Sequence, residues 1–80
     1  MKRSEARILI FLSNADDRHK YAKYMAIKLR MDYGYLLKIL NGLKFYKIII
    51  PHKRDNKVFY SINPNKREQL IKARIRLGKE

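Results

Sequence analysis

Cysteine and tryptophan are absent from this sequence, which has only three glycines and two prolines among its 80 residues. Without cysteine, the chain has no disulfide, no thiolate ligand for a metal and no thiol nucleophile. Long apolar runs are missing too, because the longest, Ile8 to Leu12, has five residues, whereas a membrane-spanning helix needs about 20. We therefore expect no membrane-spanning segment and no signal peptide, and a soluble, cytoplasmic protein.

Acidic residues are scarce as well. Seven Asp and Glu stand against 20 Lys and Arg, which gives a formal net charge of +13. A surface this basic repels itself and favours a polyanionic partner: DNA, RNA or, less readily, an anionic membrane. A chain of 80 residues makes one domain with a single modest core, too small for a deep substrate cleft.

Groups suited to catalysis or metal binding are few. Asp16, Asp17 and His19 form one local cluster, and His52 and Asp55 form another. Neither cluster has the spacing of a recognised metal site or acid–base pair. Helix capping, turn formation and solvation explain both better, so we expect no enzyme activity, no metal and no cofactor.

The central stretch from Met31 to Ile50 organises the rest of the chain. Its pattern predicts a helix over 33–45, because Asp32 can cap the first turn and apolar residues follow at spacings of four and three, at Leu36, Leu40 and Leu43. A competing interpretation is a tight hairpin, since Asn41-Gly42 between two apolar runs is a strong hairpin signal. Good helix formers before Asn41 favour the helix.

Two further helices are expected before this one. The first covers 4–13 with Ser4 as its cap, and it is apolar around nearly its whole circumference after Arg7. Either it is a central helix wrapped by the others, or a dimer partner covers its surplus face. The second covers 17–30, with a basic outer side, and a connection of only three residues leads to the helix at 33–45.

A strand signal begins at Ile48, and the segment 48–62 predicts a β-hairpin that turns at Asp55-Asn56. A two-residue turn there places Arg54 opposite Lys57 and Ile49 opposite Ile62. A last helix is expected over 64–77, with Asn63 or Asn65 as cap, Pro64 in the first turn and Gly78 at the end.

This order of three helices, a two-stranded wing and a helix resembles a winged helix-turn-helix domain. Tyr24-Met25-Ala26 stands where MarR-like and ArsR-like regulators have Glu-Leu-Ala, and the leucines of 33–45 match their recognition helix. The run 43–49 resembles their exit into the wing, with Lys47 at the usual Gly position. Tyr60-Ser61-Ile62-Asn63 resembles the strand that closes the wing. The resemblance implies a mainly α fold with a small β-hairpin, from an archaeal or viral source.

The resemblance also implies a function, a sequence-specific transcription regulator that binds double-stranded DNA and is associated with the nucleoid. The helix 33–45 would enter the major groove, and the wing would contact the backbone or the minor groove. A homodimer would form through the first and last helices. The implied DNA-binding residues are Tyr33, Gly34, Tyr35, Lys38, Asn41, Arg30, Lys28, Lys53, Arg54 and Lys57.

Two other functions remain open. A winged helix can serve as an assembly or protein-interaction subunit of transcription or RNA-processing machinery, with Leu37, Ile39 and Phe45 in the contact. An open patch of these three side chains would favour that function, whereas cations gathered around 33–45 and the wing would favour DNA. The third possibility is a non-specific nucleic-acid binder, including single-stranded RNA, which requires several tyrosines along one open basic groove.

Overall fold

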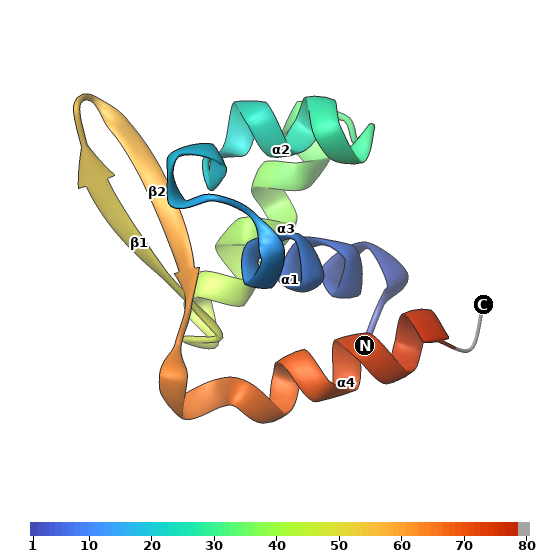
Figure 1. Ribbon diagram of the computed structural model, residues 1–80. Helices are drawn as coiled ribbons and strands as arrows, with labels where there is room; N and C mark the ends of the chain where they lie inside the picture. Colours follow the sequence, from blue (N-terminus) through green and yellow to red (C-terminus); the bar gives the residue numbers. More distant parts are fainter. Residues whose placement is uncertain (79–80) are drawn as a thin grey trace.

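The computed structural model describes residues 1–78, which form helices, a two-stranded antiparallel hairpin and a final helix (Figure 1). This arrangement is mainly helical and is compatible with a winged-helix-like fold, as the sequence predicted. The elements in chain order are α1 (Arg3–Asn14), the 3-10 turn η1 (Asp17–His19), α2 (Ala22–Leu29), α3 (Tyr33–Phe45), β1 (Ile49–Arg54), β2 (Lys57–Ile62), the 3-10 turn η2 (Pro64–Lys66) and α4 (Arg67–Gly78).

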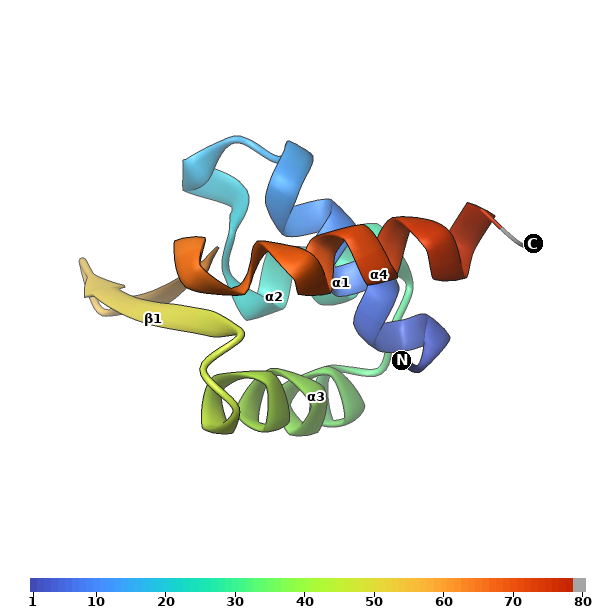
Figure 2. The ribbon, with the colours of Figure 1, turned by 90° about the horizontal axis from the view of Figure 1, so that it is seen from below.

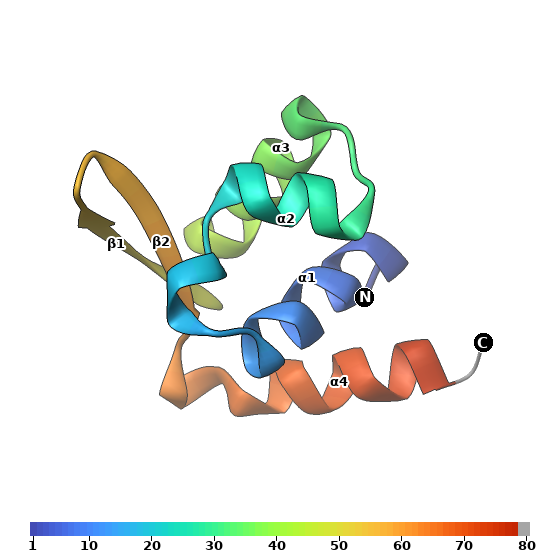
Figure 3. The same ribbon diagram turned by 45° about the horizontal axis from the view of Figure 1, so that its top comes forward.

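Helix α1 is the centre of the core. It lies between α4 on one side and α2 and α3 on the other (Figures 1 and 3). Its side chains Ala6, Ile8, Leu9 and Leu12 are buried. The strongly apolar circumference of this helix is therefore covered by the chain's own elements, which is the first of the two explanations above.

The start of α1 differs from the prediction, because Ser4 does not cap it. The helix begins at Arg3, and the backbone N–H of Lys2 donates to Glu5 Oε1 at 2.8 Å. The Ser4 hydroxyl instead lies 3.2 Å from the hydroxyl of Tyr35. Ser4 therefore joins the first turn of α1 to α3.

The second helix is shorter than the predicted 17–30. Its first part is the 3-10 turn η1, and α2 begins only at Ala22. Between them the chain is extended at Tyr21, which forms an isolated antiparallel bridge with Phe59, while the Lys20 carbonyl accepts from the Tyr60 N–H at 2.9 Å. These backbone groups are used to hold β2, so they are not free for a continuous helix.

Helix α3 has the predicted bounds, and the competing hairpin at Asn41-Gly42 does not form. Asp32 Oδ2 accepts from the Tyr35 N–H at 3.0 Å, and Leu36, Leu40 and Leu43 are buried. The helix exit is made by Lys47, whose φ of 59° is left-handed. That conformation favours glycine.

The hairpin has the predicted register, with Ile49 opposite Ile62 and Arg54 opposite Lys57. Both turn residues have positive φ, 49° at Asp55 and 64° at Asn56, as a two-residue type I′ turn requires. Ile49 and Tyr60 are buried against the helices, whereas Pro51 in the outer strand β1 is exposed. The wing is thus anchored at its base and open towards its tip.

The last helix starts later than predicted, because Pro64–Lys66 form a 3-10 turn. Asn63 Oδ1 accepts from the Asn65 N–H at 3.0 Å and so caps that turn. Ala73 is buried against α1, while Ile71 and Ile75 are 57% and 54% exposed on the outer side of α4. None of the helices within residues 1–78 has the length and apolar character needed to cross a bilayer.

Candidate nucleic-acid interface

One side of α3 is uncovered. Burial of its three leucines turns the opposite side outwards, and in Figure 2 no described element lies over that side. We define the outer face of α3 as its exposed residues at spacings of four, three and four: Gly34, Lys38, Asn41 and Phe45. Three of these were predicted site residues. Phe45, 78% exposed, was predicted only for a protein contact, although its spacing from Asn41 places it on the same side.

A groove of about 600 Å³ runs between α2, the first half of α3 and the tip of the hairpin. We name it the wing groove. It brings the predicted residues Tyr33 and Lys57 to one place, together with Asn56 and Val58 of the hairpin. Tyr33 is 50% exposed here, so its ring lines the groove while part of it stays accessible to a ligand.

The cations at the hairpin tip are held by aromatic rings. The Arg54 guanidinium carbon lies 4.6 Å from the centre of the Phe59 ring, and Lys57 Nζ lies 4.4 Å from that of Tyr21. Each contact is a cation–π interaction, which is attractive. It offsets the repulsion expected between two like charges on directly opposed positions. Lys53 projects to the other side of the hairpin, because side chains alternate along a strand.

The hairpin is tied to the helices through a row of rings. Phe59 meets Tyr21 edge to face at a centroid distance of 5.6 Å, Tyr21 lies 6.1 Å from Tyr24, and Tyr24 lies 6.1 Å from Phe11. His19 stacks on Tyr24 at 4.4 Å. This row was not predicted, because its members come from α1, η1, α2 and β2. It fixes the direction of the wing relative to α2.

Tyr35 lies on the other flank of α3, where its hydroxyl is bonded to Ser4. It is 47% exposed and lines a shallow hollow with cations from the start of the chain, Lys2, Arg3 and Arg7. No local pattern in the sequence indicates that these cations lie beside α3. They extend the basic surface beyond the N-terminal end of the outer face.

Two of the predicted residues lie at the C-terminal end of α2. Arg30 is exposed in a left-handed conformation with φ 55°. Lys28 lines a separate hollow between α1, α2 and α4, with Phe11 and Leu77. The structure therefore does not bring Lys28 together with the outer face of α3.

Acidic groups are rare around this surface. Helix α3 contains none, and the hairpin contains only Asp55 at its turn. Asp17, beyond the hairpin, has its pKa held below the usual range by a hydrogen bond from Lys20, by the charge of Lys20 and to a smaller extent by Arg54. Among residues 1–78, no group of three or more Asp, Glu or His side chains is placed to hold a metal ion.

Comparison with protein families, curated proteins and solved structures gives no match for this chain.

Proposed function

We propose that this chain is a sequence-specific transcription regulator that binds double-stranded DNA. Helix α3 would lie in the major groove, and the hairpin would act as a wing on the backbone or in the minor groove. The observation that carries the proposal is the outer face of α3, which exposes Lys38 and Asn41 on a helix without a single acidic residue. A B-form major groove is about 12 Å wide and accepts one helix.

The residues of the outer face suit different tasks. The Asn41 amide can pair with adenine and the Lys38 ammonium with guanine. At Gly34 an added Cβ would meet only the Asp32 carboxylate, at 3.3 Å, so the absent side chain allows the backbone of the first turn to approach a ligand closely. Phe45 can contact a thymine methyl group or the sugar backbone.

The wing supplies the electrostatic part of the proposed interaction. Lys53, Arg54 and Lys57 are all exposed, and cations neutralise phosphates with release of counterions. The ring contacts of Arg54 and Lys57 restrain these long side chains before DNA arrives, which reduces the entropy lost on binding. Arg30 and Lys28 would contribute only long-range attraction.

A protein-interaction function is the second candidate, favoured by one observation. Phe45 and Tyr46 form an exposed edge-to-face pair with 5.2 Å between ring centroids, and they are 78% and 69% exposed. The three-residue patch that this function requires does not form, however. Leu37 and Ile39 are partly buried and pack against the core from opposite flanks of α3. The DNA proposal is therefore the stronger one.

We also propose that the chain acts as a homodimer. Because α1 is buried within the chain, the remaining surface for the predicted contact is the outer side of α4, with Ile71 and Ile75. A symmetric pair of α4 helices would present two α3 helices to half-sites about 34 Å apart. Sedimentation at micromolar concentration should give a dimer, and Ile71→Glu with Ile75→Glu should give a monomer. A monomeric wild-type chain would remove this part alone.

The proposed function is tested by selecting bound fragments from a random duplex library and measuring their affinity by fluorescence anisotropy. With about six phosphate contacts, affinity should fall on the order of a thousandfold between 50 and 200 mM salt. Asn41→Ala should reduce the preference for the selected sequence over random duplex by about tenfold. The matched control is Lys72→Gln, which removes an exposed cation from α4 and should change affinity little.

The outcomes separate the candidates. Absence of binding to any duplex would overturn the proposal. Equal affinity for selected and random duplexes, unchanged in Asn41→Ala, would replace sequence-specific regulation by non-specific nucleic-acid binding. Tighter binding to single strands than to duplexes would favour the RNA alternative.

A further inference from the structure

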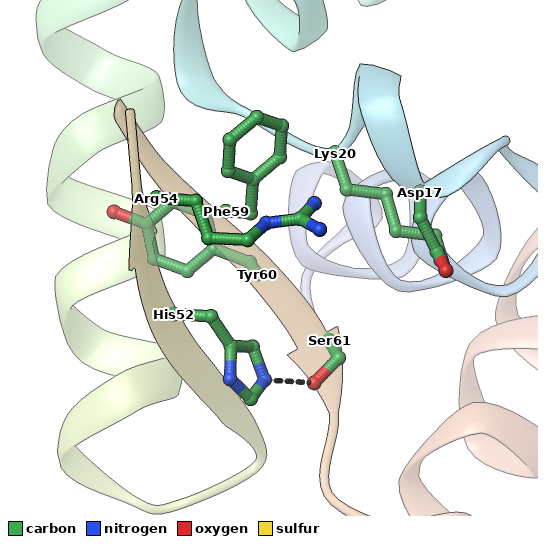
Figure 4. A pocket seen from close by; sticks show the side chains of 7 residues that line it. All are labelled: Asp17, Lys20, His52, Arg54, Phe59, Tyr60 and Ser61. Carbon is green, nitrogen blue, oxygen red and sulfur yellow. Dashed lines mark hydrogen bonds and ion pairs between the residues drawn. The ribbon is translucent and has the colours of Figure 1, made fainter. Parts of the chain in front are cut away.

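A second concave site lies on the other side of the hairpin, between the strands and η1. It has a volume of about 260 Å³. We name it the hairpin pocket, and Figure 4 shows the residues that line it: Asp17, Lys20, His52, Arg54, Phe59, Tyr60 and Ser61. The side chains of His52, Arg54, Phe59 and Ser61 share one side of the sheet, because they occupy alternate positions on paired strands. Val58 of the wing groove occupies the opposite side of the hairpin. Tyr60 lines both hollows, and their other lining residues differ.

Two basic side chains converge on this pocket. The Lys20 side chain is only 17% exposed, and its Nζ lies 2.8 Å from Asp17 Oδ1. The Arg54 guanidinium, braced on the Phe59 ring, points from the hairpin towards Lys20 and Asp17 (Figure 4). The pKa of Asp17 is lowered chiefly by the hydrogen bond and charge of Lys20 and, more weakly, by the charge of Arg54. One carboxylate therefore faces two positive charges.

A hydrogen-bonded pair of polar side chains completes the lining. His52 Nε2 and Ser61 Oγ lie 2.8 Å apart, so this pair shares one hydrogen bond and keeps further capacity for a ligand. Asp17, the single acid of the pocket, has a side chain that is 84% exposed and already accepts from Lys20. The groups facing the hollow thus suit an anion with several acceptor oxygens.

We propose that the hairpin pocket binds the phosphate group of a small ligand, either inorganic phosphate or a phosphate monoester. Arginine matches the geometry of phosphate oxygens with paired N–H donors, and lysine adds a point charge. The volume lies just below the range of about 300–1,000 Å³ for drug-sized ligands, which favours a compact anion over a large cofactor. The proposal does not depend on DNA binding.

The test is a titration of the ¹⁵N-labelled chain with inorganic phosphate at constant ionic strength, with chloride as the competing anion. Saturable shifts should be confined to amides of η1, Lys20 and the facing strand positions. Arg54→Gln should weaken binding about tenfold or more, as expected for loss of a charge-assisted hydrogen bond. Ser61→Ala should weaken it less, and Lys72→Gln on α4 should leave it unchanged. Circular dichroism confirms that each variant is folded.

Three results would overturn the proposal. They are shifts that stay linear in phosphate, shifts spread evenly over the basic surface, and equal weakening by Arg54→Gln and Lys72→Gln. A parallel titration with a short duplex distinguishes the source of the phosphate. Pocket amides that respond to the duplex but not to free phosphate would reject the small ligand and leave the proposed DNA binding intact. A response to free phosphate in a chain that binds no duplex would support the pocket and reject the proposed function.

Discussion

The Asn63 side chain donates from Nδ2 to the backbone carbonyl of Lys47, with 2.8 Å between the two atoms. The backbone reinforces this link, because the Asn63 N–H donates to the Ile48 carbonyl at 2.9 Å. The end of the hairpin is thereby fixed to the residue that leads out of α3. Lys47 has a left-handed backbone at this point, with φ 59°. This conformation is unfavourable for a lysine, and the contacts between the hairpin and the end of α3 hold it in place.

Replacing Lys47 by glycine should stabilise the chain. The left-handed conformation costs a non-glycine residue roughly 1–2 kcal/mol, of which glycine's greater freedom in the unfolded chain cancels a part. We expect a gain of about 0.5–1 kcal/mol in the free energy of unfolding, measured by urea denaturation. The matched control Lys44→Gly lies within α3 and should lose about 1 kcal/mol. A loss in both variants would contradict the prediction.

The cap of α3 should be a local source of stability. Asp32→Ala removes the carboxylate that accepts from the Tyr35 N–H, and loss of such a cap costs about 1 kcal/mol. Asp16→Ala is the comparison, because Asp16 caps only the three-residue turn η1. Thermal unfolding should show the larger decrease for Asp32→Ala. Equal decreases would mean that α3 is held by packing alone.

The ring row should control the mobility of the wing. Tyr21→Leu keeps an apolar side chain but removes the contacts with Phe59 and Tyr24 and the ring beneath Lys57. Aromatic pairs contribute about 0.5–1.5 kcal/mol beyond area burial. We expect a loss of about 1 kcal/mol and faster hydrogen exchange at the Tyr60 amide, which donates to Lys20. Tyr46→Leu removes only the exposed ring contact with Phe45, so it should cost less stability and leave exchange at the Tyr60 amide unchanged.

Phe45 distinguishes the two candidate functions. Phe45→Ser should leave stability within about 0.5 kcal/mol of the wild type, since the side chain is 78% exposed. If α3 lies in the major groove, the variant should bind duplex several-fold more weakly. An unchanged duplex affinity, together with loss of a co-purifying protein that binds the wild type, would favour the protein-interaction function.

The features that local signals determine were predictable from the sequence. Asp32 and the three spaced leucines define α3, and Asp55-Asn56 define the turn and hence the hairpin register. The break before Ala22 was not predictable in this way, because Tyr21 is extended through its bridge to Phe59, a partner 38 positions later in the chain. Long-range pairing overrode the helical pattern there.

The candidate site was predicted only in part, for the same reason. Lys38 and Asn41 follow from helical periodicity, and so does the outward position of Phe45. The rings that hold Arg54 and Lys57 belong to other segments, and no local pattern indicates that Lys2 lies near Tyr35. Which cations share a surface depends on tertiary packing rather than on spacing.

Proline in the outer strand has a consequence for behaviour at high concentration. Strand β2 is covered on one side by β1 and meets Tyr21 on the other, so β1 is the open margin of the sheet. Pro51 offers no N–H to an incoming strand, and Lys53 places a charge next to it. Both features oppose the edge-to-edge pairing of sheets that leads to aggregation. The projecting hairpin can therefore remain exposed without recruiting other chains through its backbone.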